Sequence, residues 1–192
     1  MYGNCCYLIM ESLNLKRTMY LTEDEIRDNA KVILGFDEKD PNVKQGTGQI
    51  TTFNQLGFKG VSDKPDGWYL PNDKQDIAII LETKSEKEDV FSEKHYAELV
   101  KNIEIAALQY KRVVGILYNG TDVRVIKYIK GSEQYEEIAD VAKTLQNKRY
   151  YIALFKENRI NKQLIYSLTK KINDCLHVQF GIKNLYHRMI IT

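Results

Sequence analysis

The apolar run at residues 77–81, which ends directly in Glu82-Thr83-Lys84, constrains the fold of this chain more than any other segment. Consecutive apolar residues of this kind are typical of a strand that is buried on both faces. Because side chains alternate along a strand, Glu82 and Lys84 point to one face and Thr83 points to the other. We therefore predict a buried strand that carries a carboxylate and an ammonium group where it leaves the core.

The segment before this run predicts a hairpin that brings a second carboxylate to the same place. Residues 71–73 (Pro-Asn-Asp) have turn chemistry and lie between an aromatic strand at 68–70 and the apolar run. Asp66, within a Pro-Asp-Gly segment, comes just before the first strand. The two strands can bring Asp66 and Glu82 together at one end of the hairpin, which is a metal-site geometry.

These groups are the ones that metal-dependent hydrolysis of a phosphodiester needs. Mg²⁺ keeps several waters, so Asp66, Glu82 and the backbone carbonyl of Thr83 suffice as protein ligands, and Mn²⁺ can substitute. Lys84 would orient the attacking water or stabilise the developing negative charge. Each motif alone has a plainer interpretation, as a same-face ion pair or as a turn. Their combination, followed by a helix and another apolar strand, favours the catalytic interpretation.

The rest of the chain predicts an α/β fold, with a central mixed β-sheet flanked by helices and a C-terminal helical extension. Thr22 and Glu25 form a capping box that opens a helix ending at Gly35, and Ser92 caps a second helix. Asn119-Gly120 is a hairpin signal. We expect helix at 92–111 and 160–176, helical turns near 137–146, and strands at 48–53, 113–118 and 123–129.

Composition limits the class of protein without identifying it. The chain has 192 residues, of which 43% are hydrophobic, and a net charge of +2, which is too small to indicate nucleic-acid binding by itself. Its three cysteines do not form a disulfide framework, which predicts a reduced, cytoplasmic protein, and we expect no membrane span. We divide the chain into residues 1–150, the α/β domain, and residues 151–192, the helical extension.

Several of these features together resemble the PD-(D/E)xK nuclease superfamily, whose core runs helix, three strands, helix, strand. The features are Pro-Asp at 65–66, Glu-Thr-Lys at 82–84, the amphipathic helix and the strand at 113–118. The closest likeness is to the N-terminal endonuclease domains of type IIG and type I restriction-modification enzymes. It rests on residues 22–27, on the Glu-Thr-Lys strand end and on residues 109–120.

The resemblance implies a restriction-endonuclease-like core over residues 1–150. It implies that Asp66, Glu82 and Lys84 are catalytic and that Asp66, Glu82 and Thr83 hold Mg²⁺. Members of the superfamily often place a glutamate on the first helix near the metals, and Glu25 is the first candidate for this accessory role. The capping box is an equally good explanation of Glu25.

Two details of the resemblance concern the flanking helices. Glu23 is the second candidate for the accessory glutamate. Type I relatives often carry Gln-x-x-x-Tyr on the helix after the site, whereas here Gln109 directly precedes Tyr110. This departure points to the broader superfamily rather than to the type I enzymes.

The expected function is that of a Mg²⁺-dependent DNA endonuclease domain in a restriction-modification enzyme. Its partners would be double-stranded DNA and a methyltransferase or specificity region, in the same chain or in a separate subunit. The apolar end at residues 187–192 favours a fragment of a longer protein, with residues 151–192 as the link to a missing C-terminal region. The alternatives are a non-catalytic DNA- or protein-binding domain with the nuclease fold, and a stand-alone repair or junction-cleaving nuclease.

Contacts to the DNA backbone are expected from lysines in the loops on either side of the site. The candidates are Lys39, Lys44, Lys59, Lys64, Lys87 and Lys94. Trp68 and Tyr69 are interpreted as core residues rather than as groups that stack on bases.

Overall fold

The computed structural model describes residues 20–131, 134–138, 142–178 and 181 of the chain. The chain divides into two compact units, residues 1–145 and residues 146–192. None of the helices in the described ranges has the length and apolarity that a membrane crossing requires.

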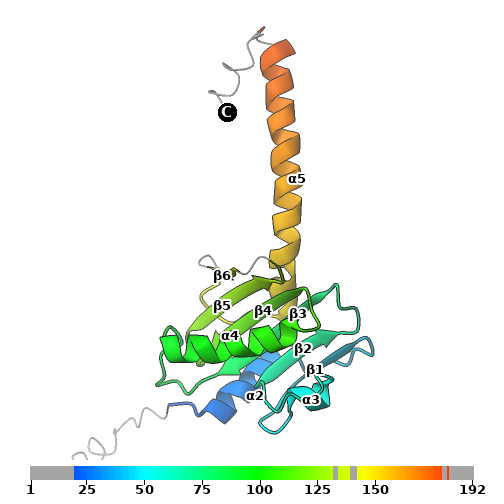
Figure 1. The fold of residues 1–192 in the computed structure, drawn as a ribbon. Helices are drawn as coiled ribbons and strands as arrows, with labels where there is room; N and C mark the ends of the chain where they lie inside the picture. The colour runs from blue at the N-terminus through cyan, green and yellow to red at the C-terminus, as the bar shows by residue number, and fades with distance from the viewer. Residues whose placement is uncertain (1–19, 132–133, 139–141, 179–180, 182–192) are drawn as a thin grey trace, which may run out of the picture. The chain divides into compact units, whose positions relative to one another are not determined.

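The first unit is an α/β domain built on a mixed sheet, which in the described residues has six strands (Figure 1). Its elements are α2 (Glu23–Leu34), β1 (Val43–Thr47), α3 (Phe53–Leu56), β2 (Gly67–Pro71), β3 (Ile77–Thr83), α4 (Glu93–Ala107), β4 (Arg112–Tyr118), β5 (Val123–Ile129) and β6 (Tyr135–Glu137). The strands lie in chain order, and every neighbouring pair is antiparallel except β3 and β4, which are parallel. The expected fold class is confirmed.

Helix α4 makes the crossover between the parallel strands and packs on one face of the sheet (Figure 1). Its close approach depends on Gly115 in β4. A Cβ at this position would lie 2.8 Å from Cγ1 of Ile103 and 3.1 Å from Cδ1 of Leu99. Only glycine therefore lets the helix lie this near the strand.

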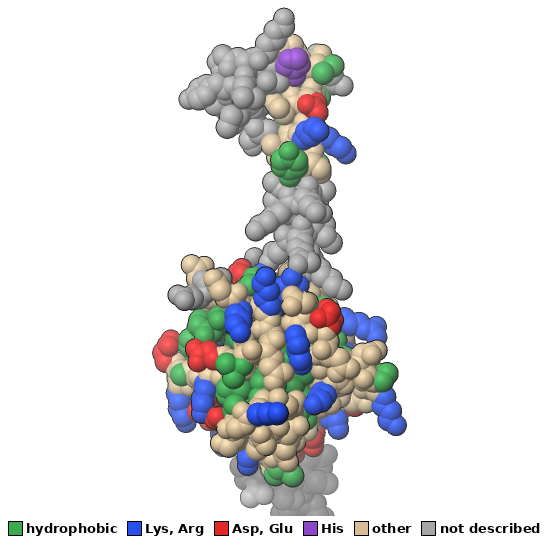
Figure 2. All heavy atoms as spheres, turned by 45° about the vertical axis from the view of Figure 1, so that its right-hand side comes forward, with side chains coloured by type: hydrophobic (Ala, Val, Ile, Leu, Met, Phe, Trp, Pro, Cys, Tyr) green, Lys and Arg blue, Asp and Glu red, His purple; other side chains and the backbone are tan. Residues whose placement is uncertain are grey.

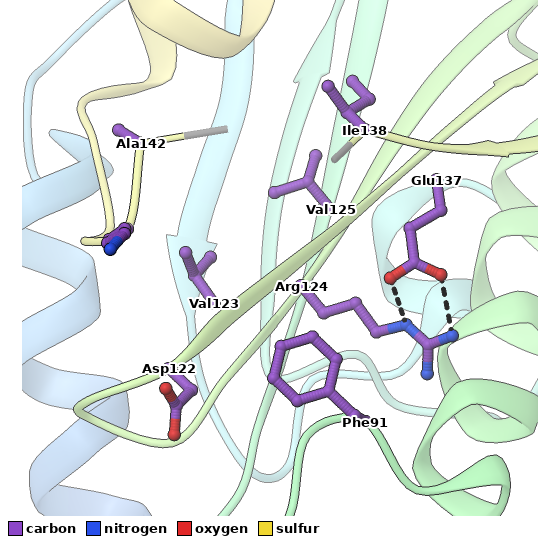
Figure 3. Close-up of a pocket in the computed structure, with 9 residues that line it drawn as sticks. Phe91, Asp122, Val123, Arg124, Val125, Glu137, Ile138 and Ala142 are labelled. Atoms are coloured by element: carbon purple, nitrogen blue, oxygen red, sulfur yellow. Dashed lines mark hydrogen bonds and ion pairs between the residues drawn. The ribbon is translucent and has the colours of Figure 1, made fainter. Parts of the chain in front are cut away.

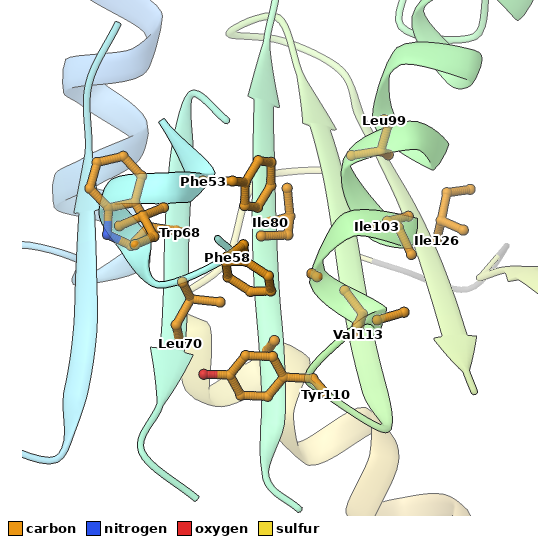
Figure 4. Packing of buried hydrophobic residues seen from close by; sticks show 14 of the residues in the cluster. Phe53, Phe58, Trp68, Leu70, Ile80, Leu99, Ile103, Tyr110, Val113 and Ile126 are labelled. Atoms are coloured by element: carbon orange, nitrogen blue, oxygen red, sulfur yellow. The ribbon is translucent and has the colours of Figure 1, made fainter. Parts of the chain in front are cut away.

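The main core lies between α4, α3 and the sheet, and Figure 4 shows aromatic rings from several elements meeting there. Trp68 and Phe53 belong to this cluster, as does Ile80 of β3. Trp68 is a core residue, as predicted. Helix α2 contacts β1 and β3, and its apolar residues Ile26 and Ala30 are fully buried.

The predicted boundaries of several elements need correction. The strand expected at 48–53 is wrong: β1 ends at Thr47, and Thr52 caps the short helix α3 instead, with Gln55 completing a capping box. The hairpin at Asn119 is confirmed, but its loop spans residues 119–122, because the last strand pair is Tyr118 with Val123. The helical turns expected near 137–146 are not found in the described part of that range: Glu137 ends β6, and residues 138 and 142–146 are not helical. Residues 139–141 lie outside the described residues.

The second unit contains helix α5 (Lys148–Val178), which includes the helix predicted at 160–176. The predicted domain boundary after residue 150 falls inside this helix, and the two units separate after Leu145. Residues 187–192, on which the fragment hypothesis rested, lie outside the described residues, as do Cys5 and Cys6.

Candidate active site

The register of the β2–β3 hairpin brings two of the predicted catalytic carboxylates together. Gly67 pairs with Leu81, so one residue further along, Asp66 comes opposite Glu82. Residues directly opposite each other in an antiparallel pair have their Cβ atoms about 5 Å apart. The two side chains therefore meet at the end of β3, as the hairpin prediction required.

Both carboxylate oxygens of Asp66 are hydrogen-bonded. Oδ2 accepts from the backbone N–H of Thr83 at 2.7 Å and from its hydroxyl at 3.0 Å. Oδ1 accepts from Nη1 of Arg27, on α2, at 3.0 Å. Arg27 is only 5% exposed and also forms ion pairs with Glu23 and Asp24. A buried guanidinium thus lies among three carboxylates at the edge of the site.

Glu82 is buried, at 7% exposed, on the face that α4 covers. Its Oε1 accepts a hydrogen bond from Nδ2 of Asn102, on α4. Burial, reinforced by the negative charge of Asp66, raises the pKa of Glu82 to about 8. The nearby ammonium of Lys84 and the bond from Asn102 lower this pKa without cancelling the rise. A carboxyl group in this environment is stabilised as an anion by any further positive charge.

Lys84 lies on the same face as Glu82, as the strand alternation predicted. Its Nζ is 2.8 Å from Oε2 of Glu98, on α4, and 3.9 Å from Oε2 of Glu82. Burial alone would lower the pKa of Lys84, but the hydrogen bond to Glu98 and the negative charges of Glu82, Glu98 and Glu23 outweigh it and raise that pKa. The ammonium group is therefore kept charged beside Glu82.

A second layer of polar side chains lies behind Lys84. The buried ring of His95 has Nδ1 3.4 Å from Glu98 and Nε2 3.5 Å from Glu88. Oε2 of Glu88 accepts from the backbone N–H of Ser85 at 3.1 Å and from its hydroxyl at 2.9 Å. The loop after β3 and the first turns of α4 are thus joined by one continuous polar network.

Of the two glutamates expected as candidates on the first helix, the structure brings Glu23 and not Glu25 close to Asp66. The carboxylate of Glu25 accepts from the backbone N–H of Thr22 at 2.8 Å in the capping box, which is its alternative interpretation. Glu23, two positions earlier on α2, has its pKa raised by burial and by the charge of Asp66. The helical turn directs Glu23 and Arg27, which are four residues apart, to the same side.

Three residues of the site were missed by the sequence analysis: Arg27, Glu98 and Asn102. Asn102 and Arg27 each interrupt the buried face of an amphipathic helix, and a polar residue in that position needs a buried partner. That interruption was a usable signal. The identity of the buried partner could not be predicted from the sequence, because it depends on how the helices dock on the sheet.

Gln109 and Tyr110 were considered because type I relatives often carry Gln and Tyr on the helix after the site. In this chain the two side chains hold the fold together through bonds to backbone carbonyls. Nε2 of Gln109 donates to the carbonyl of Gly57 at 2.8 Å, and the hydroxyl of Tyr110 donates to that of Pro71 at 2.6 Å. Pro71 ends β2, whereas Asp66 precedes its start. The two residues therefore do not take part in the candidate site.

The donor set suits a hard cation. Among the described residues, no group of three or more His, Cys, Asp and Glu side chains is arranged to hold a metal ion. The predicted set needs fewer side chains, because two carboxylates and one carbonyl are all oxygen donors and Mg²⁺ keeps several waters. The raised pKa of Glu82 beside Asp66 fits a place where a cation would relieve charge repulsion.

A hollow of about 250 Å³ lies elsewhere, beside β5 and β6 (Figure 3). Phe91 and Arg124 line it, and Arg124 donates from Nε and Nη2 to the two oxygens of Glu137 at 3.0 and 2.9 Å. The guanidinium also lies 4.5 Å from the centre of the Tyr96 ring. None of the predicted catalytic residues lines this hollow, so the candidate chemistry is not located there.

Comparison with known protein families, with curated proteins and with solved structures finds no match to this chain.

Proposed function

We propose that this chain is a Mg²⁺-dependent DNA endonuclease domain of the PD-(D/E)xK kind, acting in the cytoplasm as part of a restriction-modification enzyme. One observation carries the proposal. The β2–β3 hairpin and the α4 face bring the carboxylates of Asp66 and Glu82 and the ammonium of Lys84 together where β3 leaves the core. This is the smallest set of groups for metal-assisted phosphodiester hydrolysis.

Asp66, Glu82 and the backbone carbonyl of Thr83 would hold Mg²⁺, or Mn²⁺ in its place. When bound, the cation supplies positive charge at the attacked phosphate. Oε1 of Glu82 is already held by Asn102, which leaves Oε2 as its available oxygen. Arg27 contributes a fixed positive charge that pairs with Asp66 and holds its carboxylate in position.

Lys84 would supply the positive charge that acts on the attacking water or on the phosphate. Its ammonium has hydrogens available beyond the one directed to Glu98, and it lies on the Glu82 side of the strand. It would donate to the attacking water or to the phosphate oxygen on which negative charge develops. The substrate would be double-stranded DNA, with target recognition supplied by a methyltransferase or specificity region of the same enzyme.

Nicking of supercoiled plasmid tests the proposal. The chain should nick DNA with Mg²⁺ or Mn²⁺ and lose that activity in EDTA. Asp66→Ala and Lys84→Ala should each lower the rate at least about 100-fold, whereas Lys101→Ala, at an exposed ion pair, serves as the control. Equal nicking by the parent and by both site variants would exclude this site as the source of the activity.

A second candidate function is a DNA- or protein-binding domain that has the nuclease fold without catalysis. One observation favours this candidate: both carboxylate oxygens of Asp66 accept hydrogen bonds from Arg27 or Thr83. A carboxylate with a purely structural role would show the same bonds. Calorimetric titration with Mn²⁺ separates the two candidates. Binding that Asp66→Ala abolishes supports the nuclease, and no binding at millimolar Mn²⁺ supports the binding domain.

A further inference from the structure

We propose that Glu98 is the positioning residue of Lys84: it holds the ammonium at the distance from Glu82 that the reaction needs, and His95 and Glu88 hold Glu98 in turn. This inference rests on the proposed nuclease function. It adds a residue that neither the sequence motif nor the two-carboxylate site contains.

The distances assign the anchoring role to Glu98. Nζ of Lys84 is 2.8 Å from Glu98 but 3.9 Å from Glu82, so the hydrogen-bonded ion pair is with Glu98. If Lys84 paired fully with Glu82 instead, it would occupy the oxygen that a divalent cation needs. Glu98 thus keeps the ammonium of Lys84 near Glu82 and leaves the Glu82 oxygen open to a cation.

The helix and the strand match each other in spacing. Glu98 and Asn102 are one helical step of four residues apart, a rise of about 6 Å. Glu82 and Lys84 are two residues apart on β3, a rise of about 6.6 Å. Because α4 runs opposite to β3, Asn102 meets Glu82 and Glu98 meets Lys84. One helix face therefore positions both catalytic side chains of the strand.

Glu98 is itself restrained. The same oxygen that accepts from Lys84 lies 3.4 Å from Nδ1 of His95, and the other ring nitrogen of His95 is 3.5 Å from Glu88. Leu99, the next residue on α4, is fully buried in the core. A carboxylate held in this way selects one position for the flexible lysine side chain, which lowers the entropy cost of reaching the reactive geometry.

The first arm of the test observes Lys84 without catalysis. In a ¹H–¹⁵N spectrum of lysine ammonium groups with Mg²⁺ present, Lys84 should give a slowly exchanging signal, assigned by its loss in Lys84→Ala. The signal should disappear in Glu98→Ala and persist in Glu93→Ala, which removes an exposed carboxylate from the same helix. Persistence of the parent signal in Glu98→Ala would overturn the proposal.

The second arm measures single-turnover cleavage at saturating DNA and Mg²⁺. Glu98→Ala should lower the rate about 10- to 100-fold, while the Kd values for Mg²⁺ and DNA stay within about twofold of the parent. Glu98→Gln should recover part of the rate, because its amide oxygen still accepts from Lys84. A purely structural role would lower affinity and stability without this rescue.

The two arms distinguish the possible failures. Loss of the ammonium signal with an unchanged cleavage rate would show that anchoring Lys84 does not serve the reaction. A parent chain that cleaves with neither Mg²⁺ nor Mn²⁺ would overturn the proposed function and, with it, the part of Glu98 in the reaction. In that case the ammonium signal still decides whether Glu98 holds Lys84.

Discussion

Glu82 is the residue where burial and charge conflict most strongly. Its carboxyl group lies beside Asp66, out of contact with most solvent, and only Asn102 and Lys84 offset the cost of ionising it. Groups with strongly shifted pKa values are concentrated at functional sites. The unusual environment of this single side chain is therefore the strongest local support for a cation site.

The raised pKa of Glu82 predicts how stability depends on pH. Its pKa is about 8 in the folded chain against 4.5 for the free group. Folding therefore takes up a proton between these values. The stabilisation is complete below pH 4.5 and is lost as the pH rises through 8, by at most about 1.4 kcal/mol per pH unit. Urea unfolding in EDTA from pH 5 to 8.5 should show this fall in the parent and not in Glu82→Gln. Parallel curves for the two chains would contradict the prediction.

Arg27 predicts a second effect at the residue scale. Arg27→Met leaves Asp66 without its charge partner in a buried place and should lower the free energy of unfolding by about 3 kcal/mol. Mn²⁺ should restore part of this loss, because the cation supplies the missing charge at Asp66. Lys101→Met breaks an exposed ion pair with Asp63 and should cost less than about 1 kcal/mol. Thermal unfolding with and without Mn²⁺ checks both. Equal losses in the two variants would show that Asp66 is not specially dependent on Arg27.

Helix α4 is the element on which the site depends most. It is the crossover between β3 and β4, it closes the core, and its polar positions contact both Glu82 and Lys84. Its distance from the sheet is set by Gly115. The packing of the core and the geometry of the candidate site thus depend on the same helix.

Gly115→Ala tests this link. The added methyl group overlaps Ile103 and Leu99, so it should cost about 1–3 kcal/mol in unfolding free energy and push α4 away from β4. Cleavage should fall as well, because Glu98 and Asn102 move with the helix. Gly48→Ala, where the nearest atom is 3.4 Å away, is the matched control for stability. Loss of stability with full cleavage would show that the site tolerates movement of α4.

At the scale of the whole molecule, the net charge is small, and on the face drawn in Figure 2 the positive charges are spread rather than concentrated. The net charge is +2, and lysine and arginine side chains are scattered over the face of the folded unit in Figure 2. DNA affinity would then come from a few local lysines near the site. Among the candidates, Lys44 already has a partner in the chain, because its Nζ donates to the carbonyl of Leu56 at 3.2 Å.

Salt dependence of DNA binding tests the local lysines. In the Lys84→Ala background, chosen to suppress the expected cleavage, the observed affinity should fall as salt rises. Adding Lys64→Ala, two residues before Asp66, should reduce the salt slope by about 1. Lys111→Ala, just before β4 and at the opposite end of that strand from the site, should leave the slope unchanged. Fluorescence anisotropy over a salt series gives both slopes, and an equal effect of the two changes would point to non-specific attraction.

The sequence by itself determined the elements that local physics controls. Thr22 and Ser92 cap the helices where the motifs placed them, because a cap needs only its own first turn. The apolar run at 77–81 became the buried strand, and its alternation placed Glu82 and Lys84 on one face. The pairing of Asp66 with Glu82 followed from the turn between two short strands. All of these predictions depend only on contacts between residues that are close along the chain.

Tertiary structure alone decided which groups surround the carboxylates. Arg27 reaches Asp66 across 39 residues and Asn102 reaches Glu82 across 20, and no pattern in the sequence fixes such pairs. It also decided between Glu23 and Glu25, since both belong to the first turn of α2 and only the docking of that helix directs one of them to the site. The physical reason is that side-chain alternation and helical period set directions within an element. The distance between elements is set by packing, here by Gly115 against Ile103.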